Sequence, residues 1–124
     1  MAKPTHQDAN IMLQLLQVWA ALDISDAVGW VWSREFIPEF AEFVKKYPAG
    51  TEEYRYASKV CMYLESVGAL YKHGLFSEEL LFDWVAVDIV WERIKGFALG
   101  LREAADNPRL YENFEAMANA QKER

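Results

Sequence analysis

The sequence predicts an all-α, single-domain bundle of about five helices with a long central fourth helix. Three observations lead to this prediction. The segment 77–106 has a helix-forming composition and apolar residues on most of its circumference, so other helices must surround it. Capping residues recur along the chain, and the apolar positions between them keep a helical spacing. A chain of 124 residues, 52% of them hydrophobic, is long enough to bury one stable core without a disulfide or a metal.

The first predicted helix runs from about Asp8 to Leu22, with Thr5 or Asp8 as its cap. Its apolar row at helical spacing consists of Ile11, Leu15, Val18, Trp19 and Leu22. The next segment, 23–32, fits a loop, a short extended piece or a continuing helix. The sequence does not distinguish these structures, because the segment contains Gly29 and three consecutive β-branched and aromatic residues.

The second predicted helix covers 33–46, with Ser33 as its cap. Pro38 falls inside it, so the helix either starts nearer Phe36 or bends at the proline. Thr51 caps a third helix, which carries carboxylates in its first turn and ends near Gly68. The core row of this third helix consists of Tyr54, Ala57, Val60, Cys61, Leu64 and Val67.

Ser77 caps the fourth predicted helix, which extends to Asp106. Asn107 followed by Pro108 marks the start of the fifth helix, because a cap residue before proline is typical of a helix N-terminus. Residues 1–7 and 121–124 are expected to be frayed, and the whole chain, 1–124, is expected to form one domain.

A fourth helix of thirty residues would be about 45 Å long, whereas a compact domain of this size is about 35 Å across. The domain is therefore elongated or the helix bends. Gly96 and Gly100 are the candidate hinges, and with Ala104 they also form a row of small side chains. Close packing of another helix on this row is favoured over a kink.

Composition limits the possible partners. The net charge is −6 and the Lys and Arg residues form no basic run, which argues against nucleic acid and against an anionic membrane surface. No stretch is apolar enough to span a membrane, and the N-terminus lacks a signal core. Cys61 is the one cysteine, so an internal disulfide is excluded and a cytoplasmic location is expected. Most aromatic side chains from Trp30 to Phe43 are expected in the core, and any left exposed would mark a partner surface.

Charged side chains on the fourth helix are the first candidates for chemistry: Asp88, Glu92, Lys95, Arg102 and Asp106. Two carboxylates at i and i+4 can share a divalent metal, but the di-iron helical pattern also needs a histidine that this helix lacks. A solvated face with a Glu92–Lys95 pair is therefore favoured, and no metal site is predicted.

Asp83 and Glu65 border apolar faces, so each is expected to find a partner or to be exposed. For Glu65 the possible partners are Arg55, Arg93 and Arg102, and a structural ion pair between helices is expected. Cys61 lies on a core row and is expected to be a buried, unreactive residue. The sequence contains no phosphate-binding loop, zinc spacing or nucleophile elbow, so no catalytic residue or cofactor is predicted.

The segment from Val60 to Ser77, then Trp91 and Arg102, then 110–117, resembles a group of small all-helical microbial domains of unknown function. The resemblance covers about half of the chain, residues 60–117. It implies a helical bundle and directs attention to Glu65, Trp91 and Arg102. It implies no activity or ligand.

Two functional hypotheses follow. The favoured one is a non-catalytic protein-interaction or regulatory domain, with a protein partner or self-association. The alternative is a small-molecule-binding or enzymatic bundle with an interhelical aromatic pocket. Its lining is predicted to consist of Tyr63, Trp84 and Trp91, with Glu65 or Arg102 as the polar anchor.

Overall fold

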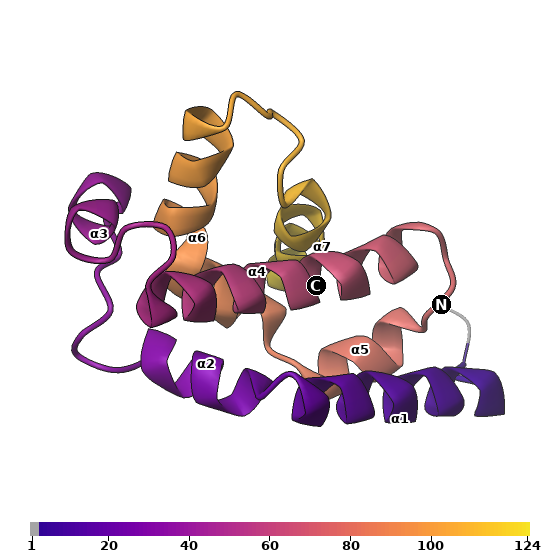
Figure 1. The fold of residues 1–124 in the computed structure, drawn as a ribbon. Coiled ribbons are helices and arrows are strands. Elements are labelled where there is room, and N and C mark those ends of the chain that lie inside the picture. The colour runs from indigo at the N-terminus through magenta and orange to yellow at the C-terminus, as the bar shows by residue number, and fades with distance from the viewer. Residues whose placement is uncertain (1–2) are drawn as a thin grey trace.

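The computed structural model describes residues 3–124, and within that range the chain forms seven helices and no strand (Figure 1). The helices are α1 (His6–Ala21), α2 (Ile24–Val31), α3 (Phe40–Lys46), α4 (Glu52–Lys72), α5 (Glu78–Trp84), α6 (Val87–Ala104) and α7 (Glu112–Glu123). The all-α class is confirmed, and the predicted number of five helices is wrong. One of the two additional helices is α2, which lies in the segment that the sequence left open. The other arises because the predicted helix 77–106 is divided into α5 and α6.

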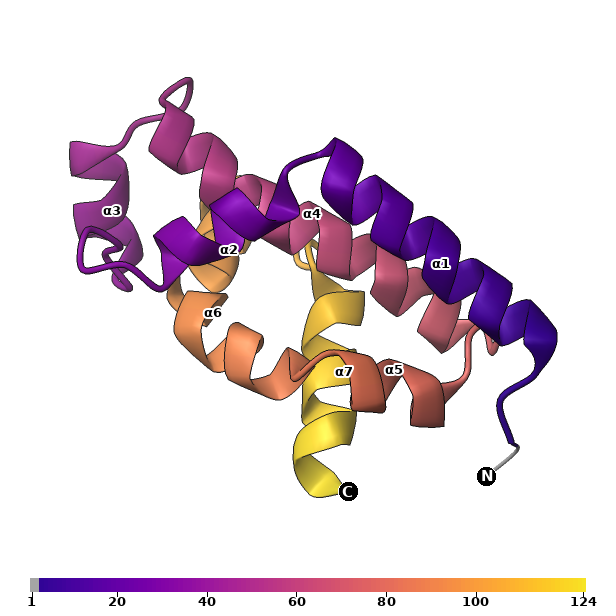
Figure 2. The same cartoon turned by 90° about the horizontal axis from the view of Figure 1, so that it is seen from below.

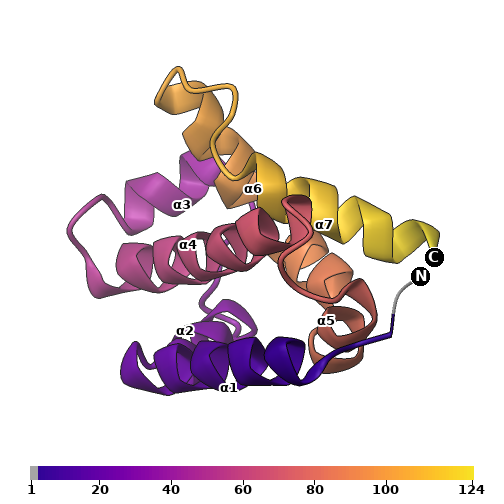
Figure 3. The same cartoon turned by 90° about the vertical axis from the view of Figure 1, so that its right-hand side faces the viewer.

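Helix α4 occupies the centre of the molecule. It contacts α2, α6 and α7, while α1 and α2 lie along one side and α6 and α7 lie on the other (Figures 1 and 3). Helix α3 packs against α6. The prediction that 77–106 forms the central helix is therefore wrong. That segment is apolar on much of its circumference, yet Ile89 and Leu99 are exposed, so the helices that pack against α6 do not surround it.

The segment 77–106 is divided by a break at Val85–Ala86, where the backbone becomes extended (φ −128°, ψ 130° at Val85). One side chain from α7 satisfies both sides of the break. The Gln121 carbonyl oxygen accepts from the Asp88 N–H (3.0 Å), and the Gln121 amide donates to the Val85 carbonyl (3.0 Å). The break lies well before Gly96, so the glycines are not its cause.

Gly96 and Gly100 instead permit close packing, as the sequence favoured. A Cβ on Gly96 would lie 2.0 Å from the Pro38 carbonyl oxygen, and one on Gly100 would lie 2.2 Å from the Phe40 ring. The start of α3 and the segment before it therefore sit directly on the backbone of α6. Only glycine leaves room for that approach.

Residues 23–32, which the sequence left open, are mostly helical. Asp23 adopts a left-handed conformation (φ 54°), and α2 follows at 72° to α1. The next predicted helix starts later than expected, at Phe40 rather than at Ser33 or Phe36. Pro38 lacks an N–H and disfavours helical backbone at the residue before it. The Glu39 carboxylate, accepting from the Ala41 N–H (2.9 Å), caps the helix.

Helix α7 also starts later than predicted, at Glu112 instead of Asn107. The Asn107 side chain accepts from the Arg109 N–H (3.2 Å) and so forms a local turn, not a helix cap. Tyr111 precedes α7 in a left-handed conformation (φ 60°). The C-terminal residues 121–123 are helical, and the expectation of a frayed 1–7 falls partly on residues 1–2, outside the described residues.

Most of the aromatic segment lies in the core, as predicted. Phe36 and Phe43 are buried, while Trp32 is exposed. The Trp30 ring makes edge contacts with Phe36, Phe43 and Tyr47, with centroids 5.7, 5.9 and 5.3 Å away. Edge-to-face geometry is the favourable arrangement for such rings.

Asp8 joins the start of α1 to the start of α5. One carboxylate oxygen accepts from the Thr5 N–H (2.8 Å) in a capping box, and the other accepts from the Ser77 N–H (2.9 Å). These bonds, chiefly those from Thr5, lower the pKa of the Asp8 carboxyl below its ordinary value. Each favours the ionised form.

We expect Gly96→Ala to lower the free energy of unfolding by about 3 kcal/mol, because the new methyl group overlaps a backbone carbonyl that cannot move aside cheaply. The matched control is Gly29→Ala in α2, where a Cβ meets nothing within 4 Å. The control should be neutral or stabilising by up to about 1 kcal/mol. Urea unfolding followed by circular dichroism measures both, and equal effects of the two changes would contradict the close approach.

Asp8 gives an expectation about pH. Because the pKa is lower in the folded state, its contribution to stability is complete above the ordinary value of about 4 and is lost as the pH falls through the folded pKa. Wild-type protein should therefore be more stable than Asp8→Ala at pH 7, and the difference should shrink from pH 4 downward. Urea titrations at several pH values measure this difference. A difference that stays constant down to pH 2 would contradict the capping role.

Candidate functional site

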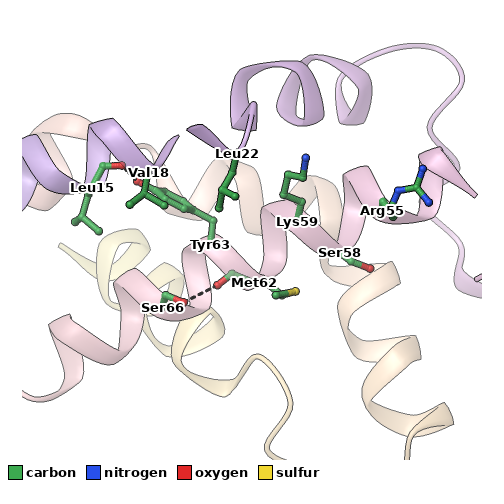
Figure 4. Close-up of a pocket in the computed structure, with 9 residues that line it drawn as sticks. All are labelled: Leu15, Val18, Leu22, Arg55, Ser58, Lys59, Met62, Tyr63 and Ser66. Carbon is green, nitrogen blue, oxygen red and sulfur yellow. Dashed lines mark hydrogen bonds between the residues drawn. The ribbon is translucent and has the colours of Figure 1, made fainter. Parts of the chain in front are cut away.

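An apolar groove of about 520 Å³ lies between α1 and α4, which run side by side in opposite directions (Figures 2 and 4). Two residues of α1 and the residue that follows its last turn, Leu22, face six residues of α4 across it. The lining consists of Leu15, Val18, Leu22, Arg55, Ser58, Lys59, Met62, Tyr63 and Ser66.

The floor of the groove is formed by Tyr63, which reaches from α4 to α1. Its hydroxyl donates to the Leu15 carbonyl, and its ring meets Trp19 edge-on with centroids 5.5 Å apart. The Trp19 indole N–H in turn donates to the Ser25 hydroxyl (2.7 Å). Burial raises the pKa of Tyr63 to about 12, so its hydroxyl stays protonated and remains a donor at neutral pH.

The walls of the groove are apolar and open to solvent. Val18 is 44% exposed, Leu22 46% and Met62 61%. None of the α1 residues His6–Ala21 is fully buried, although the helix is mostly apolar. A helix of this composition normally has its apolar surface covered.

Sequence reasoning placed Val18 and Leu22 in a core row and gave Met62 no role. The row does face the rest of the protein, but α4 covers it incompletely. One signal in the sequence indicated this surface: residues 9–22 contain no charged side chain, and their apolar arc is wider than one buried stripe requires.

The polar groups of the groove lie mainly at the end near Leu22. Arg55 and Lys59 line that end, and Arg55 donates to the Gly50 carbonyl (3.1 Å). Within residues 3–124, neither cation takes part in a salt bridge. The hydroxyl of Ser66, at the opposite end, donates to the Met62 carbonyl one turn earlier (3.0 Å).

Of the five residues predicted to bind a ligand, Tyr63 alone lines this groove. Glu65 lies on another face of α4 and caps α7. Its carboxylate accepts from the backbone N–H groups of Asn113 (3.0 Å) and Phe114 (2.9 Å) and from the Asn113 side-chain amide (2.9 Å). The prediction of an interhelical ion pair for Glu65 is therefore wrong, because the positive end of a helix takes the place of an arginine.

Arg102, on α6, also holds the start of α7. It donates to the Leu110 carbonyl (2.9 Å) and pairs with the Glu115 carboxylate (3.0 Å). Its second terminal nitrogen is buried without a hydrogen-bond partner among the residues described. Arg102 and Glu65 thus both hold the chain that leads into α7.

The two tryptophans predicted to bind a ligand, Trp84 and Trp91, lie outside the groove. Trp91, 4% exposed, packs edge-on against Phe114 with centroids 5.0 Å apart, and Trp84 meets Phe76 at 6.5 Å. The structure therefore brings Glu65, Trp91 and Arg102 to the start of α7, but it does not join all five residues around one pocket.

The remaining candidates for chemistry are an exposed carboxylate, a surface ion pair and a buried thiol. Asp83 is exposed. Glu92 and Lys95 form the predicted pair at 2.8 Å. Cys61 is buried, and this burial raises the pKa of its thiol well above the ordinary value, so the thiolate nucleophile is disfavoured. Within residues 3–124, no three His, Cys, Asp or Glu side chains are grouped to hold a metal ion.

Among residues 3–124, no single helix is both long enough and apolar enough to cross a membrane. Only α1 and α2 taken together, with their 72° bend, reach the required length and composition.

The fold and the groove describe a small all-helical domain. The chain belongs to the family described as domain of unknown function (DUF4760), whose model matches residues 4–121. The resemblance found for residues 60–117 is confirmed and extends to nearly the whole chain. No curated protein and no solved structure matches the chain.

We expect Glu65→Ala to lower the free energy of unfolding by about 2–3 kcal/mol, because it leaves two N–H groups of α7 without an acceptor. Glu65→Gln keeps the shape and one acceptor oxygen, so it should cost less. Chemical unfolding measures both variants, and hydrogen exchange at Asn113 and Phe114 reports the loss of the cap. Unchanged exchange at these two amides in Glu65→Ala would contradict this role.

Proposed function

We propose that the protein is a non-catalytic interaction domain whose binding surface is the groove between α1 and α4. The observation that carries the proposal is an apolar surface that the fold leaves open on two helices. Val18, Leu22 and Met62 remain about half exposed in it. A partner that covers them would gain about 1 kcal/mol from each half-exposed side chain.

A protein partner fits the charge of the chain better than the alternatives. With a net charge of −6 and its cations dispersed, the chain would repel nucleic acid and anionic lipid. The partner is then another protein or a second copy of this chain. The free, buried Cys61 supports a reducing compartment, the cytoplasm, as the place of the interaction.

The chemistry of the groove also supports binding over catalysis. Its nine lining residues include no carboxylate, imidazole or thiol, which are common general acids, bases and nucleophiles. Tyr63 is neutral and engaged with the α1 backbone. The alternative of a small-molecule site at Tyr63, Glu65, Trp84, Trp91 and Arg102 stays a prediction, with most of these side chains already engaged within the fold.

We expect Met62→Glu and Val18→Asp to lower the amount of bound partner about tenfold or more, because each places a charge in the apolar contact. Partners captured from an extract of the source organism by immobilised wild-type protein are quantified by mass spectrometry. Both side chains are substantially exposed in the free protein, so circular dichroism and thermal unfolding should change little.

The matched control is Leu75→Glu, which changes an apolar residue of similar exposure (58%) outside the groove. This control should capture the same partners as wild type. Light scattering over a range of concentrations tests whether the partner is a second copy. A strictly monomeric protein whose captured set is the same for Met62→Glu and Leu75→Glu would contradict the proposed function.

A further inference from the structure

We propose that the groove between α1 and α4 receives an amphipathic helix of a partner protein, one with carboxylates in the turn next to its apolar row. This inference rests on the proposed function, since it specifies the chemistry of the partner at the same surface. Three features carry it: the spacing of the lining residues, the openness of the groove and the charge at one end.

The spacing of the lining residues matches a helix. Leu15, Val18 and Leu22 follow one another on α1 at intervals of three and four residues. On α4 the row is Arg55, Lys59, Met62 and Ser66, at intervals of four, three and four. Two such rows side by side form a seat for the side-chain ridge of a third helix. The α4 row is about 17 Å long, which corresponds to about three turns of the bound helix.

The openness of the groove favours a helix over a small amphiphile. A small-molecule site usually encloses most of its ligand, roughly 70–90% of the ligand surface. Here the walls are two convex helices, and their apolar side chains remain about half exposed to solvent. An acyl chain in this groove would stay largely wet, whereas a helix would turn only one face toward it and keep its polar face in water.

The charge at one end specifies carboxylates. Arg55 and Lys59 lie beyond Leu22 at that end (Figure 4), and no carboxylate in residues 3–124 forms a salt bridge with them. Glu52, on the preceding turn of α4, is engaged by the Tyr56 hydroxyl (2.7 Å). Arg55 and Lys59 are the two charged side chains among the nine that line the groove, and both are cations. Charges at the rim of an interface mainly set specificity and the rate of association.

The two cations at this end of the groove also disfavour a second copy of α1 as the occupant. Helix α1 is apolar and exposed, but it carries no charged residue between Asp8 and Asp23. Two α1 helices packed in each other's grooves would cover the leucines and leave Arg55 and Lys59 without counter-charges.

The experiment uses three fluorescein-labelled 18-residue model helices of alanine and glutamine. Each has leucines at positions i, i+3 and i+7, and the turn after this row carries two glutamates, two glutamines or two lysines. Fluorescence anisotropy measures binding to wild-type protein, to Met62→Glu and to the double variant Arg55→Glu/Lys59→Glu. The matched control is Lys45→Glu/Lys46→Glu, which makes the same change in net charge at exposed positions of α3.

We expect the glutamate peptide to bind wild type most tightly and the lysine peptide most weakly. Arg55→Glu/Lys59→Glu should weaken binding of the glutamate peptide about tenfold and reverse the order of the peptides, as expected for two rim charges. The Lys45/Lys46 control should keep the wild-type order, and Met62→Glu should abolish binding of all three.

Other outcomes overturn the inference in distinguishable ways. Equal binding of the three peptides, lost in Met62→Glu, would refute the acidic partner and leave the proposed function intact. Absence of peptide binding together with displacement of a groove-bound dye by sodium laurate would assign the groove to an acyl chain. A concentration-dependent dimer that Met62→Glu dissociates would assign it to a second copy. Partner capture that Met62→Glu does not alter would refute the proposed function itself.

Discussion

Helix ends that lie inside a protein leave backbone N–H and C=O groups that need partners, and here side chains from distant helices supply them. Glu65 on α4 caps the start of α7, and Gln121 on α7 joins both sides of the α5–α6 break. Arg93 on α6 donates to the Val31 carbonyl (2.8 Å) at the end of α2. Each bond fixes where one helix ends relative to another. Together they link α4 to α7, α7 to the α5–α6 break, and α6 to the end of α2.

The groove follows from this arrangement. Helix α4 uses its buried faces for α2, α6 and α7, and α1 lies along the side that remains. Helix α1 is attached by the Tyr63 hydroxyl, by the Trp19 ring and, at its start, by the Asp8 carboxylate. It has no fully buried residue to bring it closer to α4. The seam between the two helices is therefore apolar and partly open, and the cations of α4 mark one end of it.

The parts of the fold that depend on local interactions could be predicted from the sequence. Thr51 and Ser77 cap α4 and α5 through bonds to N–H groups three residues away. The close approach at Gly96 is long-range, and it could be predicted because small residues at helical spacing mark such a contact whatever its partner. The break at Val85 was missed because the side chain that bonds both of its sides, Gln121, lies 33 positions after Asp88 in the sequence. The groove was missed for a related reason: periodicity identifies the apolar face of α1 but not whether another helix covers it.

The position of Gln121 has a consequence for the order of folding. The segment 77–106 has the composition of one continuous helix, and local interactions alone give it no reason to break at Val85. The groups exposed by the break find their protein partner only when α7 has packed, because Gln121 lies 33 positions after Asp88 in the sequence. Contacts of such separation form late because the loop must first close. The angle between α5 and α6 therefore depends on the packing of α7.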